Sequence, residues 1–285
     1  MEFVNAKSSK EAIDALAKYN GSARLIAGGS DVMVDMSVGK IQTDALVDVT
    51  ACEDMKGIKV EGKELVIGAS TTLTEIATSD VVKKYFPSLA KGCGSVGSLQ
   101  IRNSATLTGN VVTAQPAADG AMAVAPLLPR FIVLTKGGEK VMEMKDMYAG
   151  FGKSALDPTK ELIKEIRINL PEKDEKASYI RLELRKSLSL PMLNVAAMAK
   201  IVNKKYEYVR ITMGPVGVGP WRATQAEEWL KGKEVTKENM EKAGEMSLLD
   251  AKPRSNPLRG SKEYRESVLP VLVRRALEEV SAQMK

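Results

Sequence analysis

Histidine is absent from the 285 residues, and cysteine occurs only twice, as Cys52 and Cys93. Without histidine, the chain lacks the Ser-His-Asp and Cys-His catalytic sets and the commonest metal ligand. Two cysteines form neither a disulfide framework nor a paired-cysteine metal site, and an iron–sulfur cluster normally needs four thiolates. We therefore expect no metal site on this chain, and we expect both cysteines to be small buried side chains.

Aromatic residues make up only 5% of the chain, and no apolar run reaches the ~18 residues that a membrane span needs. A nucleic-acid-binding surface would combine clustered basic residues with stacking aromatics, but the net charge of +6 is spread along the chain. The first residues, Met1 to Asn5, do not begin a signal peptide, and scarce cysteine suits a reducing compartment. We expect a cytoplasmic protein with no membrane span and no nucleic-acid partner.

Two segments of small residues are the most informative part of the chain. Residues 25–31 read Leu-Ile-Ala-Gly-Gly-Ser-Asp, and residues 100–110 end in Leu-Thr-Gly-Asn. Glycine and hydroxyl residues let backbone N–H groups approach an anion closely. Neither segment matches the GxGxxG dinucleotide fingerprint or the GxxxxGK[ST] phosphate loop. Two such segments predict a ligand with a pyrophosphate in its middle and a long group at each end.

Capping and turn signals predict a mixture of helices and strands in the first half of the chain. Ser8 and Glu11 form a capping box that opens a helix. Residues 92–119 show no helical stripe, so we expect a long functional loop there, and we expect Asp119 to cap the helix that follows. Strands are expected over residues 23–27, 45–49, 64–68 and 161–170, a hairpin over 131–144, and a helix after a second capping box, Thr72 to Glu75.

A charged stretch over residues 171–176 marks the expected boundary between two domains. The last helix repeats apolar side chains at helical spacing from Tyr264 to Val280, which is typical of a face that packs on a core. Helices and strands do not alternate regularly, which favours an α+β fold over a doubly wound parallel sheet. In this second half, strands are expected over residues 178–184, 195–202 and 206–213, and further helices over 223–230 and 237–248.

With these residues in view, the chain resembles the FAD-binding (medium) subunits of the molybdenum hydroxylases. This is the family of xanthine dehydrogenase, carbon monoxide dehydrogenase and nicotinate dehydrogenase. The family usually has two glycines before the asparagine of its second flavin motif, and this chain has Thr108 as the first of the pair. The segments that carry the resemblance are Ala27 to Asp31, Ile101 to Asn110, Gln115 to Asp119, Arg222 to Glu227, Arg259 to Arg265 and Leu272 to Leu277.

The resemblance implies an architecture. Residues 1–173 would form a two-lobed FAD-binding domain of the vanillyl-alcohol-oxidase (PCMH) type, with lobes of about 1–55 and 56–173. Residues 174–285 would form a smaller domain of the carbon monoxide dehydrogenase flavoprotein type, with a three-stranded antiparallel sheet and helices. FAD would lie in the cleft between the lobes and this second domain.

The resemblance also implies a function. The chain would be the electron-transfer subunit of a complex in which a large partner, holding a molybdopterin cofactor, oxidises the substrate. Electrons would pass through the two [2Fe-2S] clusters of a small partner to FAD on this chain, and then to NAD or another acceptor. The flavin carries the redox chemistry, so we expect no residue of this chain to act as an acid or base on the organic substrate.

Several residues are expected at the flavin, and the sequence leaves a structural alternative open for most of them. Asp119 would accept hydrogen bonds from flavin or ribityl hydroxyls, unless it only caps a helix. Arg181 would be the cation beside flavin N1, unless it is a solvated strand residue; Arg185 and Lys186 are alternatives. The expected cofactor contacts are Leu25, Ile26, Ala27, Gly28, Gly29, Ser30, Asp31, Val32, Val96, Ile101, Thr106, Gly109, Asn110, Thr113, Asp119, Ile166 and Arg181.

Two other functions compete with the electron-transfer subunit. A stand-alone flavin oxidoreductase of the same superfold would need its own proton donor and substrate domain, and the absence of histidine argues against it. An interaction module without a cofactor would use the glycine segments as plain turns, and bound FAD would exclude it.

Overall fold

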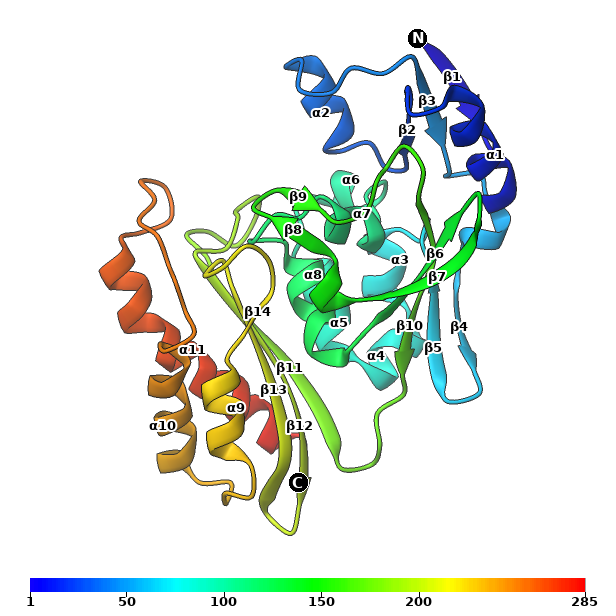
Figure 1. Ribbon diagram of the computed structural model, residues 1–285. Coiled ribbons are helices and arrows are strands. Elements are labelled where there is room, and N and C mark those ends of the chain that lie inside the picture. The colour runs from blue at the N-terminus through cyan, green and yellow to red at the C-terminus, as the bar shows by residue number, and fades with distance from the viewer. Residues whose placement is uncertain (285) are drawn as a thin grey trace.

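The computed structural model describes residues 1–284, and Figure 1 shows their strands gathered into an N-terminal, a central and a C-terminal sheet. The N-terminal sheet is parallel, in the order β1 (Glu2–Asn5), β3 (Ala45–Asp48) and β2 (Ala23–Ile26), and it is covered by α1 (Ser9–Tyr19). The Ser8 hydroxyl accepts from the Glu11 N–H, as predicted, whereas the Glu11 carboxylate accepts from the Lys7 N–H. The strands expected at 23–27 and 45–49 are confirmed.

The central sheet is antiparallel and forms the frame of the second lobe. Its order is β4 (Ile58–Glu61), β5 (Glu64–Gly68), β10 (Leu162–Asn169), β6 (Arg130–Thr135) and β7 (Gly138–Glu143). The expected hairpin and both expected strands are therefore confirmed. Short turns complete the lobe: η1 (Glu53–Met55), η2 (Ala125–Leu127), η3 (Met144–Asp146) and the small hairpin β8 (Tyr148–Gly150) and β9 (Lys153–Ser154).

The long loop expected over residues 92–119 is wrong, because short helices occupy much of it. Ser98 and Thr106 are helix N-caps, and their hydroxyls accept from the N–H groups of Ile101 and Gly109. Helices this short show no apolar stripe, and their hydroxyl caps are the residues that looked like loop. The helices between the strands are α3 (Leu73–Thr78), α4 (Asp80–Tyr85), α5 (Pro87–Gly94), α6 (Leu99–Arg102), α7 (Leu107–Val112) and α8 (Asp119–Val124).

The C-terminal sheet separates two apolar cores. Along one of its strands, Ala196 and Met198 belong to the larger core, while Val195 and Ala197 belong to the core beneath the C-terminal helices. Figure 1 shows those helices on one face of the sheet. The order of its antiparallel strands is β11 (Glu175–Leu182), β12 (Leu193–Val202), β13 (Lys205–Gly214) and β14 (Trp221–Arg222). The helices are α9 (Thr224–Leu230), α10 (Lys237–Ser247) and α11 (Lys262–Ala282).

The three long strands of this sheet confirm the expectation, and the two-residue β14 adds a short edge strand that it missed. Strand β11 begins at Glu175, inside the charged stretch that marks the expected domain boundary. The boundary between residues 173 and 174 stays a prediction. No helix within residues 1–284 combines the length and the apolar content needed to cross a membrane.

Gly244→Ala is expected to lower the free energy of unfolding by about 1–3 kcal/mol, because it overpacks the contact between α10 and α11. A Cβ at Gly244 would lie 2.5 Å from the Pro270 carbonyl oxygen, which is backbone and has little room to shift. In a helix without that neighbour, alanine is about 1 kcal/mol more favourable than glycine. Gly94→Ala, whose Cβ meets only the Ala77 Cβ at 3.6 Å, is the control and should not destabilise the chain. Urea unfolding measures both, and equal stability of the two variants would contradict the packing argument.

Candidate functional site

The first glycine segment leaves its backbone donors free. It follows β2, which carries Leu25 and Ile26, and it leads into α2 (Val32–Ser37). Gly29 has a φ of +70°, a conformation that favours glycine. Residues 27–31 lie between β2 and α2. Within residues 1–284, none of their backbone N–H groups donates a hydrogen bond to a backbone or side-chain oxygen. The segment therefore presents consecutive unpaired N–H groups, as a phosphate cradle requires.

The structure brings the two glycine segments into direct contact. A Cβ at Gly28 would lie 2.1 Å from the Ser104 carbonyl oxygen and 2.7 Å from the Ala105 Cα. The same stretch is anchored from its other side, where the Leu73 N–H donates to the Ala105 carbonyl at 2.8 Å. Only a glycine allows this approach, so Gly28 sets the distance between the two lobes at this point.

In the second segment, several predicted side chains are engaged in holding α7 in place. The Thr106 hydroxyl accepts from the Gly109 N–H at 2.9 Å, and the Thr113 hydroxyl donates to the Gly109 carbonyl at 2.7 Å. The Asn110 Oδ1 accepts from the Ala121 N–H at 3.0 Å, which ties α7 to α8. The Thr108 Oγ1 is buried without a hydrogen-bond partner among the described residues.

Asp119 does not cap α8, and the sequence-based expectation of a cap is wrong. Ala118 is the N-cap residue, and the Asp119 carboxylate, whose residue is 4% exposed, turns toward the C-terminal sheet. There it accepts from the Tyr179 hydroxyl, the Arg181 Nε at 2.9 Å and the Asn194 Nδ2 at 3.4 Å. Burial raises the pKa of Asp119, against the opposing effect of the Tyr179 and Arg181 hydrogen bonds. The carboxylate thus joins the second lobe to β11 and β12.

Arg181 is not a solvated strand residue. Its side chain is 10% exposed and forms ion pairs with Asp119 and Glu183, and its guanidinium also donates to the Ser189 carbonyl. Its role beside the flavin stays a prediction, as does that of Arg185, which is exposed and donates to the Ser187 carbonyl at 3.0 Å. Lys186 is also exposed.

A cavity of about 190 Å³ opens where the second lobe meets the β11–β12 connection. Three residues expected at the cofactor, Val96, Asn110 and Asp119, line it together. The remaining lining was not among the expected contacts, although Ala117 and Ala118 belong to the segment Gln115 to Asp119 that carries the resemblance; the leucines and Ser189 come from the distant β11–β12 connection. These further lining residues are Gly97, Ala117, Ala118, Leu188, Ser189 and Leu190.

Other predicted contacts lie apart from this cavity. Ile166 is fully buried in β10, between β5 and β6, and its side chain belongs to the apolar core. Ile101 lies on α6 and is 40% exposed.

Both cysteines are free and buried, as expected. Burial raises the pKa of the Cys52 thiol to about 11 and raises that of the Cys93 thiol further. Within residues 1–284, no group of three His, Cys, Asp or Glu side chains is arranged to hold a metal ion.

These features fit FAD. The free N–H groups and the glycine contact form a cradle that a side chain would fill, and the orphaned Thr108 hydroxyl lies in the neighbouring segment. A neutral backbone cradle binds a diphosphate without a lysine. The cavity beside Asp119 supplies mainly small and apolar walls, with few polar groups, as cofactor pockets generally do.

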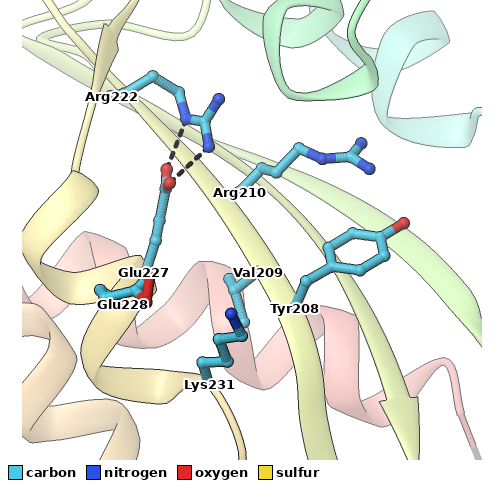
Figure 2. Close-up of a pocket in the computed structure, with 7 residues that line it drawn as sticks. All are labelled: Tyr208, Val209, Arg210, Arg222, Glu227, Glu228 and Lys231. Atoms are coloured by element: carbon cyan, nitrogen blue, oxygen red, sulfur yellow. Dashed lines mark hydrogen bonds and ion pairs between the residues drawn. The ribbon is translucent and has the colours of Figure 1, made fainter.

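A second cavity of about 260 Å³ lies within the C-terminal domain and is accounted for by packing (Figure 2). Its main feature is Arg222, which Figure 2 shows pointing at Glu227, with the Arg222 Nε donating to Oε1 at 2.6 Å. The same Glu227 oxygen accepts from the Ile211 N–H at 2.8 Å. Two residues of the motif Arg222 to Glu227 therefore fasten α9 to β13 and β14. None of the residues that line this cavity belongs to the glycine segments.

Comparison with known proteins gives matches along the chain. Residues 1–171 match the family described as the FAD binding domain in molybdopterin dehydrogenase, and residues 178–280 match the CO dehydrogenase flavoprotein C-terminal domain. The nicotinate dehydrogenase FAD-subunit of Eubacterium barkeri is 29% identical over 84% of this chain and 82% of its own. The carbon monoxide dehydrogenase medium chain of Afipia carboxidovorans is 28% identical over 100% of this chain and 98% of its own. The solved carbon monoxide dehydrogenase from Hydrogenophaga pseudoflava superposes with a TM-score of 0.93 at 25% identity, covering 99% of this chain and 98% of that one.

Proposed function

Because the chain belongs to the FAD-binding subunits of the molybdopterin dehydrogenase family, we propose that it carries electrons inside a multi-subunit oxidoreductase. In this proposal a small partner holds [2Fe-2S] clusters and delivers electrons to FAD on this chain, and NAD or another acceptor removes them. A large partner with a molybdopterin cofactor oxidises the substrate. Cytoplasmic location stays a prediction that rests on the scarce cysteines.

The observation that carries the proposal is the row of free N–H groups from Ala27 to Asp31, held against the second glycine segment by Gly28. FAD, when bound, supplies the redox chemistry. The residues of this chain bind and orient it: the first segment would hold the diphosphate, and Val96, Asn110 and Asp119 would contact the cofactor in the cavity. Leu188 to Leu190 close that cavity on the side of the C-terminal domain and would exclude water from it.

The need for partners is supported by the relatives. They are described as an FAD-subunit and a medium chain, names that belong to parts of larger assemblies, and this chain covers most of their length. The match of residues 178–280 to the CO dehydrogenase flavoprotein C-terminal domain also disfavours a stand-alone flavin oxidoreductase, which would need a substrate domain in that place.

Gly29→Asp is expected to abolish FAD retention, whereas Gly29→Asn is expected to keep most of it. Both side chains have nearly the same shape, and both residues tolerate the positive φ of Gly29 better than other side chains do. The difference is one negative charge placed beside the diphosphate. Flavin content per chain after gel filtration, read from the absorbance of the purified protein and from the released cofactor, measures the effect.

The two variants separate charge from shape. Loss of flavin in both would assign the effect to backbone strain at Gly29 and would not support the diphosphate site. Retention of flavin in both would remove the first glycine segment from the cofactor site.

A further inference from the structure

Three loops at one end of the C-terminal sheet carry no acidic residue, and the first and third of them carry five basic residues. The loops are residues 184–192, 215–220 and 251–261, and we refer to them together as the basic loop face. Elsewhere the chain mixes both signs, with 42 basic and 36 acidic residues in total. The three loops themselves carry no carboxylate, and the nearest acidic residues in sequence are Glu183 and Asp250, directly before the first and third loops. Its basic residues are Arg185, Lys186, Lys252, Arg254 and Arg259.

The three loops pack on one another and form one surface. The Lys252 N–H donates to the Val216 carbonyl at 2.9 Å, which joins the second and third loops. The Arg265 guanidinium donates to the carbonyls of Arg254 and Pro215, which joins the same two loops from beneath. The first loop meets the third where a Cβ at Gly260 would lie 2.9 Å from the Met192 methyl group.

The positive charge of this surface is not neutralised within the chain. Among residues 1–284, none of the five basic side chains lies within 4.0 Å of a carboxylate oxygen. Arg265 adds a further charge below them, since it is 4% exposed, has no carboxylate partner and leaves its Nε without a hydrogen bond. Burial, together with repulsion from Arg259 and Arg254, lowers the pKa of Arg265. A buried uncompensated cation of this kind favours an anionic neighbour.

Exposed aliphatic side chains lie among the basic residues. Leu258 is 78% exposed, and Leu184, Leu188 and Leu190 are each more than half exposed. Arg254 stacks on Phe151 with its guanidinium carbon 5.1 Å from the ring centroid, which holds it in a defined place. Leu188 and Leu190 also line the cavity at the candidate flavin site, so the basic loop face borders that site.

We propose that the basic loop face docks an acidic protein that exchanges electrons with the cofactor site beneath it. The inference rests on the proposed function and deepens it by naming the acceptor as a protein with carboxylates around an apolar contact. Each oxidised carrier protein would take up one electron. Two carriers would therefore remove the two electrons of the reduced cofactor, and its two protons would be released to water. Arginine and exposed apolar groups in one patch are typical of protein interfaces, and transient redox encounters bury less than about 1,200 Å².

The arrangement favours a protein over a lipid surface or a nucleic acid. Attraction to anionic lipids needs only net charge, whereas Arg185 and Arg254 are held in place by backbone carbonyls and by an aromatic ring. Fixed guanidinium groups suit carboxylates in defined positions. Single-stranded nucleic acids need free stacking aromatics, and the exposed large apolar side chains on these three loops are leucines and a valine.

The test uses the complex purified with its partner subunits and an immobilised plant-type [2Fe-2S] ferredoxin as the acidic probe. The variant K252E/R254E reverses two exposed charges of the face, and K83E/K84E makes the same charge change on α4 as a control. Affinity is measured by biolayer interferometry at about 20 and 200 mM salt, which differ severalfold in screening length. We expect K252E/R254E to bind at least about tenfold more weakly at low salt, and the control to differ by less than about threefold.

Two further measurements distinguish failure of this proposal from failure of the proposed function. Flavin content and reduction by substrate report on the cofactor site and should be equal in both variants. Binding that is weakened equally in the two variants, or a wild-type complex that does not bind the probe, would overturn the proposal. Salt-sensitive binding to phosphatidylserine vesicles that is lost only in K252E/R254E, without ferredoxin binding, would assign the face to a membrane instead. Loss of flavin in every preparation would count against the proposed function alone.

Discussion

Gly28→Ala should remove FAD from the purified chain, with affinity falling by at least about a hundredfold, or about 3 kcal/mol. The added methyl group would lie 2.1 Å from the Ser104 carbonyl oxygen and 2.4 Å from its carbonyl carbon. Both are backbone atoms, and the neighbouring Ala105 carbonyl is already fixed by the Leu73 N–H, so the second segment has little freedom to retreat. The first segment must move instead, and its free N–H groups would lose their place opposite α7.

The measurement is flavin content per chain together with the thermal midpoint. Gly137→Ala is the matched control, because Gly137 also lies in a turn and its Cβ would meet only the Thr135 hydroxyl at 3.7 Å. Gly28→Ala should lose the cofactor while the chain still unfolds cooperatively, and Gly137→Ala should keep both properties. Normal flavin content in Gly28→Ala would show that the contact between the segments does not position the cofactor.

Much of the fold could be predicted from local sequence signals. The strand before the first glycine segment, the capping box at Thr72 and the long final helix all appear near their expected positions. These elements are specified by residues close together in the chain. The short helices α6 and α7 could not be recognised, because four to six residues show no periodicity and their serine and threonine caps resemble loop. The edge strand β14 has only two residues and gave no signal.

The site was predictable only in part, for the same reason. The glycine segments carry their chemistry in consecutive residues, so their backbone geometry follows from the sequence. The surroundings of Asp119 do not, since Tyr179 and Asn194 lie 60 and 75 residues further along the chain. An aspartate before an apolar run is typical of an N-cap, and the tertiary contact across the domain boundary overrides that local preference. The leucines at 188 and 190 are likewise placed by the fold.

Asp119→Ala is expected to destabilise the chain by about 3–5 kcal/mol, because it removes one partner of a buried ion pair. Arg181, with 10% of its side chain exposed, would keep only Glu183 as an ion-pair partner, and the buried Tyr179 hydroxyl would lose its acceptor. Asp119→Asn is expected to restore part of this stability, because the amide oxygen still accepts from the Tyr179 hydroxyl and the Arg181 Nε but carries no charge to pair with the guanidinium. Urea unfolding at neutral pH compares the three proteins. A small effect of the alanine variant would show that water or a rearranged Arg181 replaces the carboxylate.

The pH dependence of the same comparison tests the charge itself. Burial raises the folded-state pKa of Asp119 above its ordinary value of 3.8, so the folded state binds the proton more tightly than the unfolded state. The part of the Asp119 contribution that depends on its proton is therefore fully present below pH 3.8 and is lost as the pH rises through the raised pKa, while the hydrogen bonds to Tyr179 and Arg181 remain. Asparagine has no such proton, so the stability of the wild type relative to Asp119→Asn should decrease as the pH rises. An increase would mean that the Arg181 pair outweighs burial.

Flavin content separates the two roles of Asp119. If Asp119 also contacts FAD, Asp119→Asn should lose flavin at normal stability, whereas a purely structural role would leave the flavin bound.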